Sequence, residues 1–323
     1  MSNARQEIRI QQVEANQNGR DFVCGDIHGM VDLVTQFLSH VDFDPLKDRI
    51  FACGDLVDRG LRNEDCLRLL DEPWFFSVLG NHEQLMLEYA ADEYYGRFWP
   101  RNGGDWGTKY FPRSDVNPWD RTSHSTEYTM KDFSDIRRIV FQKVSKLPHI
   151  MTVTKKDGKK FHIIHAEFNP SAKVTDEVLA DPIRAKDIAF AQTDDGDSVV
   201  WGRYTFYRFY GEDLSSPRML SKFKRWIKIN KQDRLYNENL SLIYSGHTPV
   251  QKPLQFYGQV NLDTMAYGIC SPRTSSYKPN KNHGLTFVNP DTGECWLSNH
   301  EGVRPNQIVV IDNAEEIEDE EGS

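Results

Sequence analysis

Short apolar runs alternate with amphipathic segments in the first half of the chain. Each apolar run is bounded by Gly or Asp, which is typical of buried strands. The predicted strands cover residues 22–24, 50–53 and 75–79. Between them, apolar residues recur at helical spacing from Met30 to Leu38, and further helices are predicted over residues 63–70 and after His82. This order predicts parallel strands joined by crossover helices.

The second half of the chain is richer in predicted strands. A helix over residues 133–146 comes first and ends before Pro148. Residues 150–154 and 160–164 are predicted to form a hairpin, because the Asp157-Gly158 pair between them is a strong turn signal. Further strands are expected at residues 241–245, 259–262, 285–288, 295–298 and 307–311. Residues 170–235 are mixed and charged, and they give no clear prediction.

Residues 96–130 are rich in Gly, Pro, Trp and Arg, and we predict a long loop on the substrate side of the molecule. Trp99, Trp106 and Tyr110 within it could line a groove or could anchor the loop. The chain has no internal repeat and no linker long enough to separate two domains. We therefore expect residues 1–312 to form a single domain.

The distribution of charge limits the classes of function. The formal net charge is −9, and without the seven acids of the last twelve residues it would be −2. We expect residues 313–323 to be a disordered acidic tail. Because the rest of the chain is nearly neutral, it lacks the basic footprint that nucleic-acid binding requires.

The remaining composition predicts a protein of the cytoplasm. No run of about 18 apolar residues is present, so no membrane-spanning helix is expected. The first residues lack the apolar stretch of a secretory signal. The five cysteines include no CxxC pair, which favours a reducing compartment over a disulfide framework or a structural zinc site.

Five predicted strands end at a small residue followed by a side chain that can bind a metal ion. The segments are Gly25-Asp26-Ile27-His28-Gly29, Gly54-Asp55-Leu56-Val57-Asp58-Arg59-Gly60, Gly80-Asn81-His82-Glu83, His165-Ala166-Glu167 and Gly246-His247-Thr248. Each segment alone could be an ordinary turn. Because ligands bind beyond the carboxyl ends of strands in open α/β sheets, five such ends can converge on one site. Carboxylate, imidazole and amide groups without a thiolate suit Mn²⁺, Fe²⁺ or Zn²⁺.

This set of motifs resembles the phosphoprotein phosphatase family of metallophosphoesterases, whose pattern is GD-x-HG, GD-x-x-DRG, GNHE and two later histidines. The spacing is also similar, with 29 residues from Asp26 to Asp55 and 26 from Asp55 to Asn81. Residues 102–106 (Asn-Gly-Gly-Asp-Trp) and 262–264 (Leu-Asp-Thr) resemble bacterial and bacteriophage lambda-type members, although Met265 stands where glycine is common. The resemblance implies an α/β fold with a central β-sandwich of mixed sheets flanked by helices, the calcineurin-like metallophosphoesterase fold.

The resemblance also implies two divalent metal ions, most readily Mn²⁺, with Fe²⁺ or Zn²⁺ as alternatives. Their ligands would be Asp26 and His28 at the first ion, Asp55 as the bridge, and Asn81, His165 and His247 at the second. The phosphate-binding residues would be Arg59, Asn81 and Arg203, with Arg101 as a rival to Arg203.

The implied reaction is hydrolysis of a phosphomonoester by a hydroxide that the two metal ions hold. His82 is expected to protonate the leaving oxygen, and Asp58 is expected to orient its imidazole, unless Asp58 only caps the following helix. The chain would then be a protein serine/threonine phosphatase that could also act on phosphotyrosine, and its partners would be phosphoprotein or phosphopeptide substrates. The oligomeric state stays open.

Two other functions compete with this one. The first is a symmetrical bis(5'-nucleosyl)-tetraphosphate hydrolase, whose members often carry Asp where Glu83 stands here. The second is a scaffold that has kept the fold and lost the chemistry. Because all six metal-ligand residues are present, the scaffold is the least favoured of the three.

Overall fold

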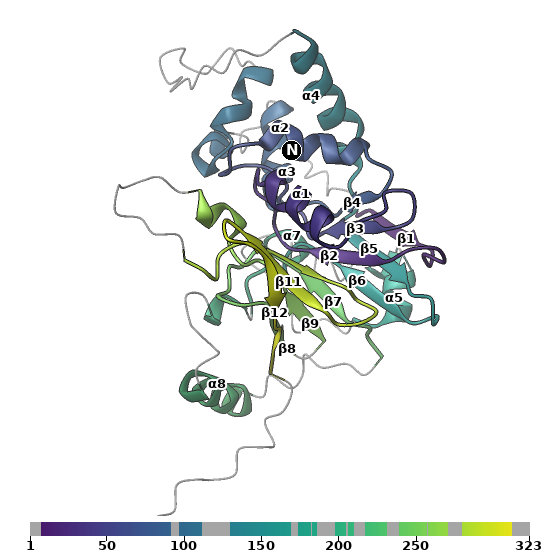
Figure 1. Ribbon diagram of the computed structural model, residues 1–323, viewed down its shortest axis with the longest axis vertical. Helices are drawn as coiled ribbons and strands as arrows, with labels where there is room; N and C mark the ends of the chain where they lie inside the picture. Colours follow the sequence, from purple (N-terminus) through teal and green to yellow (C-terminus); the bar gives the residue numbers. More distant parts are fainter. Residues whose placement is uncertain are drawn as a thin grey trace, which may run out of the picture.

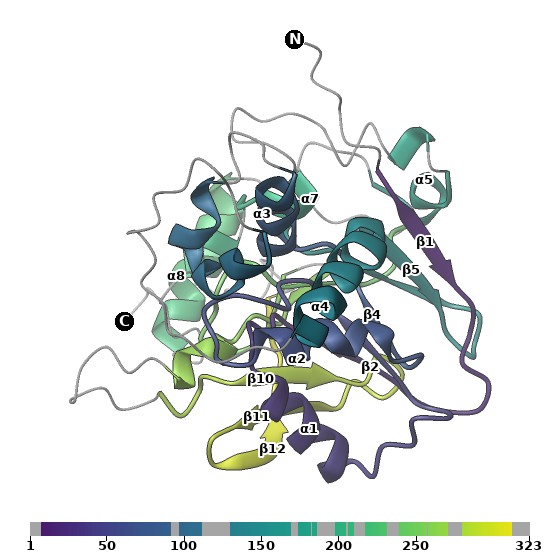
Figure 2. The same ribbon diagram turned by 90° about the horizontal axis from the view of Figure 1, so that it is seen from above.

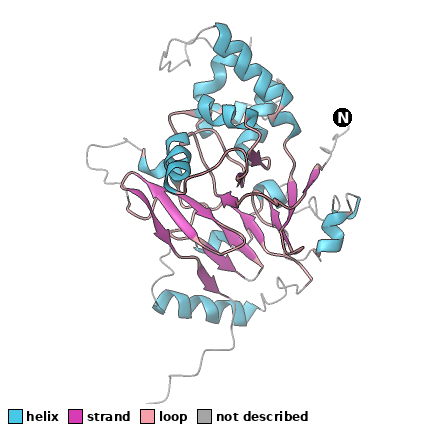
Figure 3. Ribbon diagram, turned by 45° about the vertical axis from the view of Figure 1, so that its right-hand side comes forward, coloured by secondary structure: helices cyan, strands magenta, loops and turns pink. Residues whose placement is uncertain are grey.

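The computed structural model describes two packed β-sheets and the helices that cover them. The described residues are 8–91, 97–111, 130–168, 174–181, 183–185, 198–204, 206–209, 217–230, 239–256, 258–270 and 280–311. The predicted acidic tail, 313–323, lies outside them. Figure 1 shows helices both above and below the strands, Figure 2 shows the same arrangement from above, and Figure 3 shows the strands grouped in the centre of the molecule.

The first sheet has six strands in the order β12-β11-β10-β2-β3-β4. Their bounds are Asp21–Cys24 (β2), Arg49–Ala52 (β3), Phe75–Ser77 (β4), Leu285–Val288 (β10), Cys295–Asn299 (β11) and Gly302–Asn306 (β12). β2, β3 and β4 are parallel, whereas β10 pairs with β2 in the antiparallel sense. β2 is buried along its whole length, as expected of a strand that is covered on both faces.

The second sheet has seven strands in the order β1-β5-β6-β7-β9-β8-β13. Their bounds are Ile10–Val13 (β1), Ile150–Thr154 (β5), Lys160–Ile163 (β6), Ile243–Ser245 (β7), Leu254–Phe256 (β8), Gln259–Asn261 (β9) and Val309–Ile311 (β13). The predicted hairpin is confirmed, because β5 and β6 pair in the antiparallel sense and Gly158 in their turn has a φ of +82°. The sequence pattern missed β1, β8 and β12.

One apolar layer joins the two sheets. Val23 and Phe51 of the first sheet share a buried cluster with Phe161 and Ile163 of the second. The rings of Phe51 and Phe161 meet edge to face, with centroids 6.1 Å apart. Burial of each such side chain is worth about 1.5–3 kcal/mol. The predicted sandwich of mixed sheets is therefore confirmed.

Helices cover the outer faces of the sandwich. On the first sheet lie α1 (Val31–His40), α2 (Asn63–Arg68), α3 (Asn81–Ala90) and α4 (Met130–Gln142). Phe37 of α1 stacks on Phe287 of β10 at 3.8 Å, which fixes the helix against the sheet. Further described helices are α5 (Asp176–Ala180), α7 (Ser198–Trp201) and α8 (Pro217–Asn230), and all three fall in residues 170–235, which gave no clear prediction. None of the described helices combines the length and hydropathy needed to cross a bilayer.

The segment predicted as a substrate-side loop is more ordered than expected where it is described. It contains the 3₁₀ helices η3 (Pro100–Asn102) and η4 (Asp105–Tyr110), which are too short to produce a helical repeat of apolar positions. Trp99 and Tyr110 are almost fully buried, so they anchor the segment. Residues 112–129 lie outside the described residues.

Asp176 connects α5 to β6 and to the residues that precede β7. Its carboxylate accepts hydrogen bonds from His162 Nε2 at 2.9 Å and from both the backbone N–H and the hydroxyl of Ser241 at 2.6 Å. Burial alone would raise the pKa of Asp176, but the hydrogen bonds from His162 and Ser241 hold this pKa well below its ordinary value. The ionised carboxylate therefore stabilises the fold.

We expect Asp176→Asn to lower the free energy of unfolding near pH 7 by about 1–3 kcal/mol, because charge-assisted hydrogen bonds are lost. A folded-state pKa below the unfolded value of about 3.9 stabilises the protein above that pH, and this contribution is lost as pH falls through the folded pKa. Urea unfolding over a pH series should therefore show that the difference in free energy of unfolding between the variant and the parent protein becomes smaller below about pH 4. The exposed Glu72→Gln variant is the control, and a difference that stays constant with pH would contradict the assignment.

Candidate metal centre

The turns that follow β2, β3 and β7 contain most of the left-handed non-glycine residues. Seven described non-glycine residues have a positive φ, and five of them lie in these turns: His28 (47°), Asp55 (47°), Asp58 (73°), Arg59 (69°) and His247 (69°). Such conformations cost free energy and persist where the surroundings enforce them, which is common at functional sites. The strand ends singled out in the sequence thus adopt an unusual local geometry.

Three side chains from three strand ends meet with their polar atoms in contact. Asn81 Oδ1 lies 2.9 Å from His165 Nε2 and 3.0 Å from His247 Nδ1, and the two imidazole nitrogens are 3.1 Å apart. His165 Nδ1 donates to the carbonyl oxygen of Cys53, so its Nε2 presents a lone pair to the group. Asp55 Oδ1 is 3.4 Å from the same nitrogen. These four ligand atoms could hold a cation.

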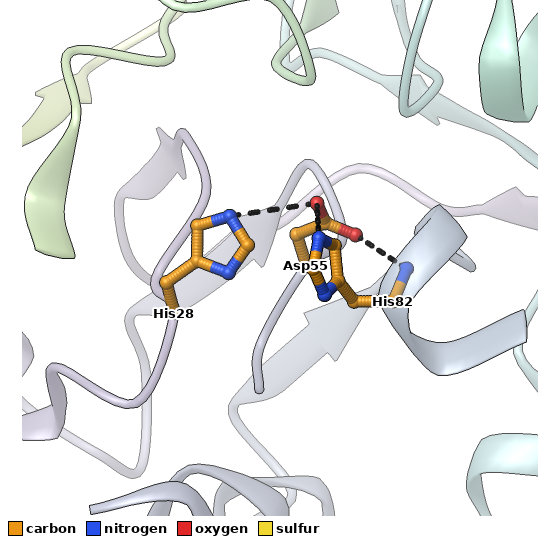
Figure 4. Close-up of side chains that lie close together, drawn as sticks. All are labelled: His28, Asp55 and His82. Atoms are coloured by element: carbon orange, nitrogen blue, oxygen red, sulfur yellow. Dashed lines mark hydrogen bonds and ion pairs between the residues drawn. The ribbon is translucent and has the colours of Figure 1, made fainter. Parts of the chain in front are cut away.

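A second group shares the carboxylate of Asp55. His28 Nε2 lies 3.6 Å and His82 Nε2 3.9 Å from Asp55 Oδ2 (Figure 4). His28 Nδ1 donates to the carbonyl oxygen of Val57, which leaves its Nε2 lone pair directed toward the group. Asp55 thus connects two potential metal positions.

Asp26 was predicted as a ligand of the first ion, but it falls outside the compact group of His28, Asp55 and His82. Its Oδ2 accepts the backbone N–H of His247 at 2.9 Å. Its Oδ1 is buried and has no hydrogen-bond partner in the described part of the chain. A Cβ on Gly246 would lie 1.8 Å from this oxygen, so the glycine makes room for it. An orphaned buried carboxylate oxygen of this kind fits a cation.

The charges of the site also fit bound cations. Burial lowers the pKa values of His28, His165 and His247, so these imidazoles are neutral near pH 7 and can act as ligands. Burial, together with the charges of Asp263 and Asp55, raises the pKa of Asp26. A buried excess of carboxylates that lacks a matching positive charge is what a divalent ion would offset.

His82 and Asp58 form a buried hydrogen-bonded pair. His82 Nδ1 donates to Asp58 Oδ2 at 2.7 Å, and neither side chain is more than 1% exposed. Asp58 does not cap the following helix, because Arg62 occupies the position before α2. The pair leaves His82 Nε2 directed toward Asp55.

Two arginines contact the histidines of the site. Arg59 NH1 donates to His28 Nε2 at 2.9 Å, and Arg203 Nε donates to His247 Nε2 at 3.0 Å. The guanidinium of Arg59 also lies over the ring of Tyr267, 4.9 Å from its centroid. Arg101 is exposed on η3, so the geometry favours Arg203 as the second arginine.

The sequence motifs gave no role to two further residues near the site. Tyr267 packs edge-on against His28, with ring centroids 5.1 Å apart. Asp263 is 1% exposed, and burial raises its pKa to about 6. Asp263 directly follows the strand predicted at residues 259–262, and this position is the sequence signal that could have identified it as a site residue.

Met265, where the family often has glycine, adopts a left-handed φ of 58°, which accounts for that glycine preference.

Comparison with known proteins agrees with this geometry. Two mixed sheets with acidic and imidazole side chains at their strand ends define a metallophosphoesterase. The family model of the calcineurin-like phosphoesterases matches residues 22–251, and the chain belongs to this family.

The similar proteins carry related names. The "Serine/threonine-protein phosphatase 2" of Escherichia coli (strain K12) is 33% identical over 173 residues, which are 54% of this chain and 70% of that protein. A symmetrical bis(5'-nucleosyl)-tetraphosphatase of Actinobacillus succinogenes is 38% identical over only 71 residues, 21% of this chain and 26% of that protein. A solved protein serine/threonine phosphatase from Saccharomyces cerevisiae aligns at 16% identity with a TM-score of 0.47, covering 95% of this chain and 86% of that one.

Glu83 joins the turns on which Asp55 and Asn81 lie. Its Oε1 accepts the backbone N–H groups of Leu56 and Val57 at 2.8 and 3.3 Å, and its Oε2 accepts those of Asp55 and Gly80 at 2.8 and 3.1 Å. The side chain is fully buried. One carboxylate therefore satisfies four backbone donors that no strand or helix pairs.

We expect Glu83→Gln to lower the free energy of unfolding by about 2 kcal/mol or more, because the amide NH₂ would face backbone donors that need an acceptor. Unfolding should be measured in chelator so that loss of metal binding does not contribute. Glu88→Gln on the same helix is the matched control, since Glu88 is half-buried. Equal stability of the two variants would show that the four hydrogen bonds do not stabilise the fold.

Proposed function

We propose that this protein is a metal-dependent protein serine/threonine phosphatase that hydrolyses phosphomonoesters on proteins or peptides. The observation that carries the proposal is the position of Asp55, which two groups of ligand atoms share, beside two arginines and a His–Asp pair. The similarity to a bacterial protein phosphatase over more than half of the chain supports the choice of substrate class.

We assign the metal ligands as the motifs suggest. Asp26, His28 and Asp55 would hold one divalent ion, and Asp55, Asn81, His165 and His247 would hold the other. The contacts among Asn81, His165 and His247 support the second set, and the orphaned oxygen of Asp26 supports the first. Oxygen and imidazole ligands suit Mn²⁺, and Fe²⁺ or Zn²⁺ could replace it. When bound, two such ions supply positive charge and an activated water as nucleophile.

The arginines and Asn81 would bind the phosphate group. Arg59 contacts His28, a proposed ligand of the first ion, and Arg203 contacts His247, a proposed ligand of the second. A phosphate placed between the two arginines could accept hydrogen bonds from both guanidinium groups. A planar guanidinium matches two phosphate oxygens at once, which suits the charge of the transition state.

His82 would donate a proton to the leaving oxygen. The alkoxide of serine or threonine is a strong base, so its departure requires an acid nearby. Asp58 accepts the Nδ1 proton of His82 and so leaves Nε2 as the nitrogen that faces the site. The pair thereby resembles the His–Asp half of a catalytic triad, in which the carboxylate fixes the tautomer and the ring orientation.

A symmetrical bis(5'-nucleosyl)-tetraphosphate hydrolase is the second candidate. The matched region covers only about a fifth of this chain. Glu83 favours the protein phosphatase, because such hydrolases often carry Asp at this position.

All five cysteines are free thiols, which suits a reducing compartment, and we infer a cytoplasmic protein.

A substrate panel tests the proposed function. We expect no activity after chelation and recovery on addition of Mn²⁺, with phosphoserine and phosphothreonine peptides hydrolysed at a higher kcat/KM than diadenosine tetraphosphate. A phosphotyrosine peptide in the same panel measures the breadth of the substrate range. Faster conversion of the dinucleotide to two ADP would favour the second candidate. Less than one bound metal ion per chain together with no hydrolysis would favour a scaffold.

We expect His82→Asn to lower kcat on a phosphoserine peptide by about 10²–10⁴-fold, because general acid catalysis is lost. On p-nitrophenyl phosphate the loss should be much smaller, since nitrophenolate leaves without a proton. The metal content, measured by elemental analysis, should not change. His149→Asn is the matched control, because His149 is equally buried away from the site. An unchanged kcat on the peptide would remove His82 from this role.

A further inference from the structure

Residues 97–111, here called the tryptophan segment, cover the carboxylate of Asp58. Trp99 Nε1 donates to Asp58 Oδ2 at 2.8 Å, and Trp106 Nε1 donates to Asp58 Oδ1 at 2.8 Å. With the bond from His82 Nδ1 at 2.7 Å, Asp58 accepts three hydrogen bonds from ring N–H groups while it is fully buried. These contacts join positions 41 and 48 residues apart in the chain.

The arrangement fixes the orientation of the carboxylate. A buried charge is stable only if hydrogen bonds replace the water that it loses. Because one indole bonds to each oxygen, the carboxylate cannot rotate about its own axis without breaking a bond. Oδ2 therefore stays directed at His82 Nδ1, and the two indole donors do not titrate.

The tryptophan segment is itself held rigidly. Trp99 is fully buried and its ring lies 5.3 Å from that of Tyr89 on α3. A Cβ on Gly104 would lie 2.3 Å from Trp99 Nε1, so only glycine leaves room for the indole there. Trp106 is half-buried and meets the rings of Trp99 and Tyr110 at 6.0 and 6.3 Å.

The same segment contacts the neighbour of Asp58. The backbone N–H of Arg59 donates to the carbonyl oxygen of Gly103 at 3.4 Å. Gly103 has a φ of +103°, and a Cβ there would lie 2.9 Å from Arg59 N. Asp58 and Arg59 both adopt left-handed conformations, so the segment supports the strained turn that presents the acid partner and the phosphate-binding arginine.

We propose that Trp99 and Trp106 are positioning residues for the reaction: their indole N–H groups hold Asp58 in the orientation that fixes the imidazole of His82 for protonation of the leaving oxygen. This proposal rests on the role proposed above for His82. It assigns to the tryptophan segment a part in catalysis that does not involve contact with substrate. It also predicts that the effect depends on how much the leaving group needs a proton.

Trp106→Phe tests the proposal, since phenylalanine keeps an aromatic ring at this half-buried position and removes the N–H group. We expect kcat on a phosphoserine peptide to fall about 10-fold, the effect of losing one hydrogen bond to a charged group, with KM and metal content unchanged. On p-nitrophenyl phosphate the fall should be much smaller. Trp74→Phe is the matched control, because Trp74 is half-buried and packs against Phe43 and Phe75. Trp99→Phe should act in the same direction, and Trp106→Phe suffices if that fully buried variant does not fold.

A spectroscopic measurement on the metal-free protein gives a readout that is independent of activity. Among the indole N–H signals of the seven tryptophans, those of Trp99 and Trp106 can be assigned, because each is missing from the spectrum of its Phe variant. We expect those of Trp99 and Trp106 to lie downfield and to exchange slowly with water. Asp58→Asn should shift both signals, because an amide offers one acceptor oxygen where the carboxylate offers two.

The outcomes separate this proposal from the proposed function. If His82→Asn shows the leaving-group effect and Trp106→Phe leaves kcat on the peptide unchanged, the positioning role is wrong and the acid role stands. An equal loss on both substrates in Trp106→Phe would show a general structural defect and would also overturn the positioning role. If His82→Asn leaves kcat on the peptide unchanged, the acid role of His82 is wrong, and the positioning role that rests on it is wrong as well. Indole signals that do not respond to Asp58→Asn would contradict the hydrogen bonds on which the proposal depends.

Discussion

The four backbone N–H groups that donate to Glu83 help to fix the position of Asp55, whose carbonyl oxygen also accepts the backbone N–H groups of Ile27 and His28 at 3.1 and 2.9 Å. The four donors to Glu83 belong to the turns after β3 and β4, which no strand or helix hydrogen bond holds together. A carboxylate between the two turns replaces those missing bonds and draws the turns together, so that Asn81, at the start of α3, and Asp55 approach each other. Because Asp55 lies between both groups of ligand atoms, Glu83 contributes to the geometry of both, together with the hydrogen bond from the backbone N–H of His82 to Asp55 Oδ1 at 3.0 Å.

This arrangement collects negative charge in the protein interior. Asp26, Asp55, Asp58 and Asp263 are each at most 2% exposed, and the neighbouring histidines are neutral near pH 7 where burial lowers their pKa values. Within the described part of the chain, Arg59 and Arg203 bring fixed positive charge close to them. The free energy of burying these carboxylates is therefore offset incompletely by the chain, and bound divalent cations would complete the balance. Metal binding and stability should consequently be coupled in this protein.

The sequence predicted the parts of the fold whose patterns are local. β2, β3, β4 and β10 consist mainly of apolar residues, and the predicted strands agree with them except at their ends. β1 (Ile-Gln-Gln-Val) and β12 (Gly-Val-Arg-Pro-Asn) are half-exposed edge strands with few apolar residues, so neither has a recognisable pattern. β8 and η3 have three residues each, too few for a period to appear, whereas the equally short β4 was predicted because its apolar run continues to Leu79.

The site also has parts with a local sequence pattern and parts without one. The ligand-type residues could be found because each follows a strand within a short Gly-containing motif. The hydrogen bonds of Trp99 and Trp106 to Asp58 could not, since they join segments more than 40 residues apart and involve a residue type that is usually part of the core. The grouping of His82 with Asp55, in addition to its pairing with Asp58, likewise depends on how two turns approach each other in space.

Two separate supports therefore act on one short turn, residues 54–60. Glu83 holds its first half, Asp55 to Val57, through the backbone. The tryptophan segment holds its second half, Asp58 through the side chain and Arg59 through the backbone. The first half carries the residue proposed to bind both metal ions, and the second half carries the proposed acid partner and the proposed phosphate-binding arginine. Since the two supports come from different elements, we expect a change in the tryptophan segment to alter proton transfer while metal binding stays intact.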